Sequence, residues 1–379
     1  MEIKTLFAAV AIAMGCTTIA SADGSPTPPP SLGPNVTNTS NKGSLLIFPL
    51  INIDPAYSAD TRIQISNDEV TPVIVECEYV NQQKARVDFI FSLSGKATAS
   101  WAVGAQIGDT FTPPTFPGAG PYPAFGNSFS GELVCFAVNN LNKSNAIVFN
   151  HLHGTATVNA VGSAIKYSPW TFRGYDASGN PTNEGAPIIN SYGAGALLLE
   201  GGLGSDYDAC PLYETTSFVP NGAALGNVTT SQNYLAVSTC NQDLRLNFNL
   251  HTTNLVFSVF NANEVGYSDA NICVDSTVLI PLIDGNTNLV DATNFDYGSL
   301  GTAGASYAVQ GVPANSSTCP QTPFGQTEAA GLLGVAASYI QVKGGSPGLI
   351  AGNLYSAGSQ FGYVQWDAGP SSAPNVKKR

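Results

Sequence analysis

The chain has 379 residues, of which 11% are charged and 43% hydrophobic, and its formal net charge is −12. The charged fraction is under half of the ~25% typical of soluble domains, although apolar residues for a core are plentiful. This balance excludes a basic nucleic-acid binder, a charge-driven disordered chain, a coiled coil and a multi-span membrane protein. It favours a secreted β protein in which Asn, Ser, Thr and Gly supply the polarity.

The first 22 residues have the pattern of a secretory signal peptide. Lys4 precedes an apolar run over residues 5–14, and small residues at 20–22 provide a cleavage site before Asp23. The run is too short to cross a bilayer comfortably, so we expect no transmembrane span. These features predict an exported protein that resides outside the cell, on its surface or in the periplasm.

A second processing route is open at the same place. Residues 13–16 (Ala-Met-Gly-Cys) resemble a bacterial lipobox, which would attach a lipid anchor to Cys16. The Leu usual three residues before the cysteine is absent. Under either route, the Pro-rich linker over residues 23–42 suits a stiff, extended tether.

From residue 43 to 170, short apolar runs alternate with polar residues and are separated by turns. Period-2 alternation of this kind predicts half-buried antiparallel strands, which we expect near residues 62–66, 75–79, 87–93, 99–103, 133–137 and 147–151. Glu76 and Glu78 then fall on the outer face of their strand. The pattern predicts an all-β fold with an antiparallel β-sandwich architecture over 43–170.

A turn-rich connector over residues 171–193 separates this unit from a second β-sandwich unit over 194–370, and residues 371–379 form a tail. In the second unit we expect strands near 244–250, 255–260, 278–283 and 361–366, and one short helix over 329–340. In the connector, Asp176, Ser178 and Asn180 fall at the first, third and fifth positions of a calcium-binding loop. Pro181 replaces the required Gly and no Glu follows at the twelfth position, so a turn is favoured.

Several short motifs occur in a fixed order: TRIQISN at 61–67, GELVC at 131–135, YDACP at 207–211, STC at 238–240 and the run 256–261. This ordered set resembles an uncharacterised family of secreted bacterial β-sandwich proteins, over residues 43–282. The resemblance implies export and a β fold. It implies no activity, because none is assigned to the family.

Six cysteines remain if Cys16 is removed or acylated, and an even number in a secreted chain indicates disulfides. Cys77 and Cys135 both lie mid-strand beside inward-looking residues, which favours a bond between the two sheets of the first sandwich. That bond closes a loop of about 58 residues. The next pairs are Cys210–Cys240 and Cys273–Cys319. No CxxC motif supports zinc or redox chemistry.

The candidate metal ligands are His151 and His153, two residues apart on an expected strand. This spacing could chelate Zn²⁺ or Cu²⁺ if another strand supplied a third ligand. The plainer interpretation is a pair of partly buried histidines at the end of a strand. The sequence predicts no cofactor.

Catalytic patterns are weak. The acidic pairs Asp206/Asp208, Glu76/Glu78 and Asp291/Asp296 have nothing in their spacing that marks a glycosidase. Residues 344–348 match G-x-S-x-G, but Pro347 lacks the N–H that a nucleophile elbow needs after the serine.

The sequence therefore favours an exported non-catalytic structural or binding protein over an enzyme. We expect a glycan or protein partner at the cell surface and no nucleic acid. One alternative is a periplasmic or extracellular metal-binding protein that uses His151 and His153. A third is a carboxylate-based carbohydrate-active enzyme.

Overall fold

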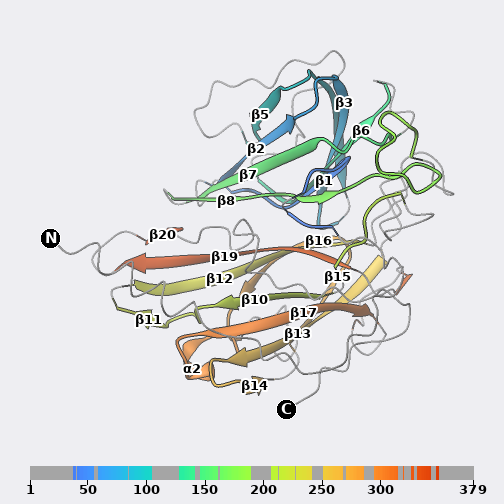
Figure 1. Ribbon diagram of the computed structural model, residues 1–379. Coiled ribbons are helices and arrows are strands. Elements are labelled where there is room, and N and C mark those ends of the chain that lie inside the picture. Colours follow the sequence, from blue (N-terminus) through green and yellow to red (C-terminus); the bar gives the residue numbers. More distant parts are fainter. Residues whose placement is uncertain are drawn as a thin grey trace, which may run out of the picture. The chain divides into compact units, whose positions relative to one another are not determined.

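The computed structural model describes residues 37–349 apart from positions 40, 55–58, 84, 105–127, 141–145, 161–162, 189–205, 212, 227, 241–250, 268–269, 286–293, 315–318, 320–325, 328–330 and 343–346. The chain divides into two compact units, residues 1–33 and 34–379, and every described residue belongs to the second. The described elements are β-strands, apart from the one-turn helix α2 (Tyr297–Leu300) (Figure 1). The all-β prediction is confirmed.

The strands of residues 45–172 form two antiparallel sheets that make up the first sandwich. One has the order β4 (Arg86–Leu93), β3 (Val73–Asn81), β6 (Phe129–Val138), β1 (Leu45–Ile53), β9 (Trp170–Phe172). The other has the order β5 (Thr98–Ala102), β2 (Asp60–Asn67), β7 (Leu152–Ala160), β8 (Ser163–Tyr167).

The strands of residues 213–349 form two more sheets, the second sandwich. One has the order β10 (Tyr213–Phe218), β17 (Ala305–Pro313), β13 (His251–Asn261), β14 (Gly266–Tyr267), and β13 also pairs with β15 (Asn271–Val274) and β18 (Gln326–Thr327). The other has the order β11 (Ala224–Leu225), β12 (Val228–Thr239), β19 (Leu332–Val342), β20 (Pro347–Leu349), with β16 (Thr277–Leu282) on β12. These pairs are antiparallel except β13 with β18.

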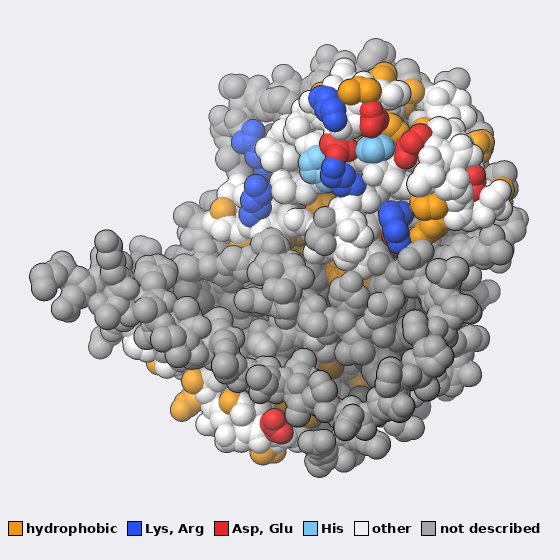
Figure 2. All heavy atoms as spheres, in the orientation of Figure 1, with side chains coloured by type: hydrophobic (Ala, Val, Ile, Leu, Met, Phe, Trp, Pro, Cys, Tyr) orange, Lys and Arg blue, Asp and Glu red, His pale blue; other side chains and the backbone are white. Residues whose placement is uncertain are grey.

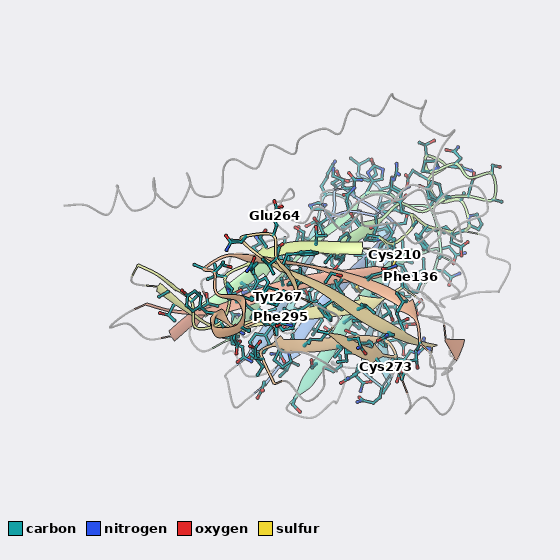
Figure 3. All side chains as sticks on the ribbon, turned by 90° about the horizontal axis from the view of Figure 1, so that it is seen from below. Phe136, Cys210, Glu264, Tyr267, Cys273 and Phe295 are labelled. Atoms are coloured by element: carbon teal, nitrogen blue, oxygen red, sulfur yellow. A yellow bond between two sulfur atoms is a disulfide. The ribbon has the colours of Figure 1, made fainter. Side chains whose placement is uncertain are left out.

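Each sandwich has its own aromatic-rich core. In the first, Trp101 donates a 2.7 Å hydrogen bond from Nε1 to the Tyr79 hydroxyl, so its one polar atom is satisfied in the interior. In the second, Phe295 lies edge-on to Phe257, with ring centroids 6.0 Å apart. Figure 3 shows Phe295 beside Tyr267, whose hydroxyl lies 3.4 Å from the backbone oxygen of Leu300 in α2.

The sheet that contains β12 and β19 is buried on both faces. Leu332 and Ala336 of β19 pack into the core of the second sandwich. The intervening Leu333, Val335 and Ala337 pack into the apolar cluster of the first. The helix expected over 329–340 is therefore wrong. A strand covered on both faces has a continuous apolar run, and periodicity cannot distinguish that run from a buried helix.

The two sandwiches share contacts through this sheet. Trp170 of β9 donates a 3.3 Å hydrogen bond from Nε1 to the backbone oxygen of Gly334 in β19. Most residues of β3 and β6 that face away from the first core are also buried, including Phe136. Glu76 and Glu78, which we expected on the outer face of their strand, are only 6% and 7% exposed, because that face is covered. Arg86 lies 3.2 Å from the Glu78 carboxylate.

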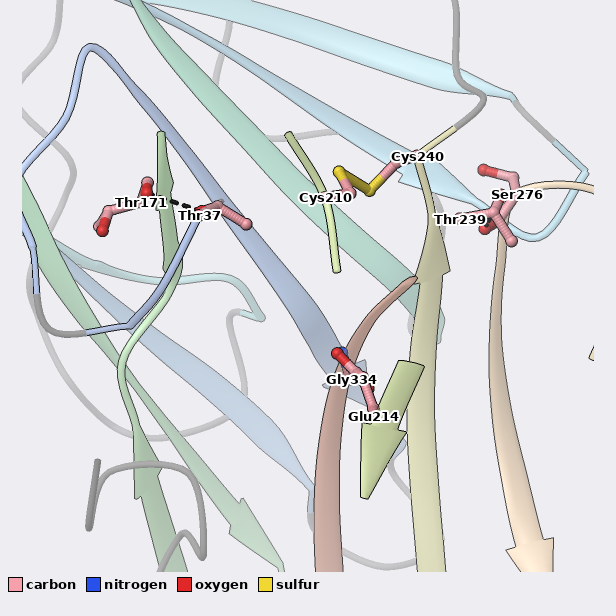
Figure 4. Close-up of a disulfide and its surroundings, with 8 residues drawn as sticks. All are labelled: Thr37, Thr171, Cys210, Glu214, Thr239, Cys240, Ser276 and Gly334. Atoms are coloured by element: carbon pink, nitrogen blue, oxygen red, sulfur yellow. Dashed lines mark hydrogen bonds between the residues drawn. A yellow bond between two sulfur atoms is a disulfide. The ribbon is translucent and has the colours of Figure 1, made fainter. Parts of the chain in front are cut away.

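The three disulfides join the pairs that the sequence favoured: Cys77–Cys135, Cys210–Cys240 and Cys273–Cys319. The expectation that the first bond links two sheets is wrong. Cys77 and Cys135 lie directly opposite each other on the neighbouring strands β3 and β6 of one sheet. Figure 4 shows the second bond, which ties the segment at Cys210 to the end of β12. Covalent links thus brace both sandwiches.

One expected strand begins later than the sequence indicates. Ile147 makes an isolated bridge to Pro187, and the amide of Phe149 donates to the Ser44 hydroxyl at 2.7 Å. His151 lies in a turn, and β7 starts only at Leu152, opposite Asn67. Predictions on residues 1–36, 241–250 and 350–379 lie outside the described residues.

Candidate functional site

His151 lies at the centre of a charged cluster built from three separate parts of the chain. Its Nδ1 is 3.1 Å from the Asp68 carboxylate, while its Nε2 is 3.8 Å from Glu69 and 3.6 Å from Glu184. Asp68 and Glu69 follow β2, and Glu184 belongs to the connector. The imidazole therefore lies within 4 Å of three carboxylates.

Two lysines complete this His151 cluster. Lys42 pairs with the Asp68 carboxylate, and Lys96 donates to the Asp68 backbone oxygen. Figure 2 shows histidine, acidic and lysine or arginine side chains gathered on one face of the first sandwich. Burial raises the pKa of the Glu184 carboxyl, and the charge of His151 opposes that shift. The cluster is an ion network that joins two loops to the start of β7.

His153 has a different environment from His151. It sits within β7 opposite Ser66, while His151 precedes the strand, so the two do not share a strand face as expected. Partial burial, reinforced by the nearby charge of Lys42, lowers the pKa of His153 below its usual value. Within the described part of the chain, no group of three or more His, Cys, Asp or Glu side chains is placed to hold a metal.

The connector that carries Glu184 is held by Asn150, the residue before His151. The Asn150 amide oxygen accepts from the Ser44 hydroxyl and the Gly174 amide, both at 2.8 Å. Its Nδ2 donates to the backbone oxygens of Gly174 and Pro181, at 3.1 and 2.6 Å. Because both the oxygen and the nitrogen of this side-chain amide are hydrogen-bonded, Asn150 fixes the connector against the start of β7.

The partial calcium pattern in the connector is a hydrogen-bonded turn. The Asp176 carboxylate accepts from the backbone amides of Ser178 and Asn180 at 2.8 and 2.9 Å, and from the Asn183 side chain at 2.8 Å. These donors hold the pKa of Asp176 below its usual value. The carboxylate oxygens close the turn, as in other Asx turns.

The candidate catalytic acids also have structural partners. Asp208 is buried, accepts from Arg173 at 2.9 to 3.2 Å, and is contacted by the Tyr175 hydroxyl. Asp296 accepts from the Asn221 side chain at 2.8 Å, and Asp291 lies outside the described residues. Pro347 begins β20, opposite Gln341, which suits a proline at the first residue of a strand.

One feature escaped the sequence analysis: a polar face on the outer side of the β5-β2-β7-β8 sheet. We define this polar face as the outward side chains of the four strands, namely Arg62, Gln64, Ser66, Thr98, Ser100, Ala102, His153, Thr155, Thr157, Asn159, Ala164 and Lys166. All are half-buried or exposed. The alternating polar residues of β2 could be seen in the sequence. The residues beside them on β5 and β7 could not, because they depend on how the strands pair.

The polar face is internally hydrogen-bonded in rows across the strands. Arg62 Nε donates to the Ser100 hydroxyl at 3.2 Å, and the hydroxyls of Ser66 and Thr98 are 2.7 Å apart. The Thr155 hydroxyl donates to Gln64 at 3.2 Å. These cross-strand pairs hold the side chains in fixed positions on a regular sheet.

Comparisons with known proteins add little. No protein-family model matches the chain, and no curated protein matches it. Among solved structures, the apo form of the Pleurotus ostreatus lectin is 13% identical, over 83% of this chain and 75% of that chain, with a TM-score of 0.16. A TM-score this low supports no argument about fold or ligand.

Proposed function

We propose that this protein is exported and acts outside the cytoplasm as a non-catalytic binding or structural protein. The observation that carries the proposal is the set of three disulfides, one of them fully buried between β3 and β6. Such bonds form and persist in oxidising compartments and are rare in the cytosol. None of the helices in the described residues is long and apolar enough to cross a membrane.

The non-catalytic part of the proposal rests on the surroundings of the candidate catalytic acids. The described carboxylates that the sequence offered as catalytic pairs are buried or hold structural partners, as Glu78 does with Arg86 and Asp208 with Arg173. A glycosidase instead presents two carboxyl groups to a substrate in a cleft. A rigid, braced sandwich with a patterned polar surface suits binding better than turnover.

A polysaccharide panel tests this proposal against the enzyme alternative. The oxidised chain is incubated with each polymer, new reducing ends are measured, and retention on the same immobilised polymers is recorded. We expect retention on at least one polymer and no new ends above a heat-denatured control. Turnover that Asp208→Asn abolishes, with the variant still folded, would contradict the non-catalytic assignment.

Metal analysis addresses the alternative function at His151 and His153. We expect chain purified without a histidine tag to hold no stoichiometric metal, and its melting temperature to be the same with and without Zn²⁺ or Cu²⁺. The matched control is the His151→Ala/His153→Ala double variant. A metal-dependent rise in melting temperature that this variant loses would favour the metal-binding function over the proposed one.

A further inference from the structure

We propose that the polar face binds an anionic polysaccharide; this deepens the proposed function and rests on it. The reason lies in the charges of the face. Arg62 and Lys166 lie on it, and none of its exposed and half-buried residues is acidic. His153 also lies on it, but its lowered pKa favours the neutral imidazole, so the positive charge comes from Arg62 and Lys166. This arrangement is notable in a chain with a net charge of −12.

The cations occupy neighbouring positions. Thr157 of β7 lies directly opposite Arg62 on one side and Lys166 on the other, so the two cationic residues flank a single hydroxyl. Neighbouring strands are about 4.8 Å apart, which places both positive groups within reach of one anionic group or two adjacent ones. In Figure 2, lysine or arginine side chains stand out in blue among white atoms in the part of the first sandwich where Figure 1 draws β2, β7 and β8.

The acid at the start of β2, Asp60, lies opposite Asn159 on the same side of the sheet as Arg62, but it is not exposed. Asp60 is fully buried, and its Oδ1 accepts from the amides of Thr61 and Gly104 at 2.6 and 2.8 Å. Asp68, beyond the other end of the strand, pairs with Lys42. The exposed surface between these two acids therefore presents positive charge and hydrogen-bonding groups.

The remaining side chains favour a polysaccharide over other polyanions. Hydroxyls and amides of Ser, Thr, Gln and Asn cover the rest of the face, and they can donate to and accept from sugar hydroxyls. The only apolar members are Ala102 and Ala164, whereas a lipid-binding surface uses larger apolar or aromatic anchors. No aromatic ring belongs to the face, whereas single-stranded nucleic acids stack their bases on such rings.

Retention on immobilised acidic polymers tests the inference. The oxidised full-length mature chain is applied to dextran sulfate, polygalacturonate and neutral dextran. We expect salt-sensitive retention on the two acidic polymers and none on neutral dextran, because exposed charges are screened by salt. Equal retention on neutral dextran, or none on any of the three polymers, would overturn the inference.

The decisive variant is Thr157→Glu, which places a carboxylate between the two cations. Glu there gains cross-strand ion pairs, so we expect the fold to persist and affinity for both acidic polymers to fall about tenfold or more. Thr157→Gln is the isosteric control and should bind like wild type. Unchanged binding by Thr157→Glu, with an unchanged melting temperature, would overturn the inference.

Charge-removal variants distinguish binding at the polar face from a general effect of the protein's net charge. Arg62→Gln and Lys166→Gln should each weaken binding, while Lys96→Gln, which removes the same charge from the turn before β5, should not. An equal loss of affinity in all three variants would show a general charge effect and would contradict a binding site on the polar face. Tighter binding to phosphatidylserine vesicles or single-stranded DNA than to the acidic polymers would overturn the polysaccharide assignment.

The two proposals fail in different ways. An exported, fully oxidised chain that ignores acidic polysaccharides overturns only the polar-face inference. A chain that stays reduced in the cytoplasm overturns the proposed function, whatever it binds in vitro.

Discussion

Asn150 shows how one side chain positions a site made from distant segments. Its amide makes four hydrogen bonds, to Ser44, Gly174 and Pro181, and so fixes the connector beside His151. Asn150 is half-buried, and leaving its hydrogen-bond partners unsatisfied costs about 1–3 kcal/mol. We therefore expect Asn150→Ala to lower the free energy of unfolding by about that amount in a urea titration.

The control for that variant is Asn183→Ala, which removes a single exposed bond to Asp176. Surface changes of this kind usually stay within about 0.5 kcal/mol. Equal effects of the two substitutions would contradict the anchoring role of Asn150.

His153 should make stability depend on pH. The fold holds its pKa below the usual 6.5, so the unfolded chain binds a proton that the folded chain does not in the window just below pH 6.5. Stability contributed by the neutral imidazole is present above pH 6.5 and is lost as the pH falls through that window. We expect His153→Gln to remove this loss.

Melting temperatures of the two proteins between pH 5 and 8 provide the check. The curves should run parallel above about pH 7 and diverge below 6.5, with wild type losing more. All other residues are the same in both proteins, so the difference between the two curves reports on His153. Parallel curves over the whole range would rule out the role assigned to His153.

Strand β3 is held to β6 by a covalent bond as well as by the sheet. In the chain-entropy model, a disulfide that closes a 58-residue loop stabilises the folded state by about 4 kcal/mol, because it lowers the entropy of the unfolded chain. We expect the Cys77→Ala/Cys135→Ala variant to lose about that much stability in guanidinium. Cys77→Ala/Cys135→Val serves as a second version that refills the space, and a loss near zero in both would contradict the bracing role.

Strand β2 was visible in the sequence because it is buried on one face only. In β2, Ile63 and Ile65 face the core while Arg62 and Gln64 face outward, so alternation was clear. In β19, both faces are covered and the alternation disappears. The His151 cluster was beyond sequence reasoning because Asp68 and Glu184 reach it through loops far apart in the chain.

The two sandwiches should unfold together, because the β12 and β19 sheet belongs to both cores. Leu333 packs against the first sandwich from a strand of the second. We expect Leu333→Ala to lower the free energy of unfolding by about 2–5 kcal/mol and to speed amide hydrogen exchange in both β2 and β13.

The exposed Val265, which is 50% accessible, offers a matched control. Val265→Ala should change stability by less than about 0.5 kcal/mol. Two separate unfolding transitions, with only one affected by Leu333→Ala, would show that the sandwiches are independent.

The central claim is that this chain works as an exported, oxidised protein. Non-reducing peptide mapping of the chain recovered from the exported fraction tests it most directly, because one experiment reads both the N-terminus and the cysteine pairs. We predict a mature chain that begins at Asp23, or at an acylated Cys16, with the three disulfides intact and no free thiol. A chain that keeps residues 1–22, stays in the cytoplasm and has free thiols at Cys77 and Cys135 would contradict it.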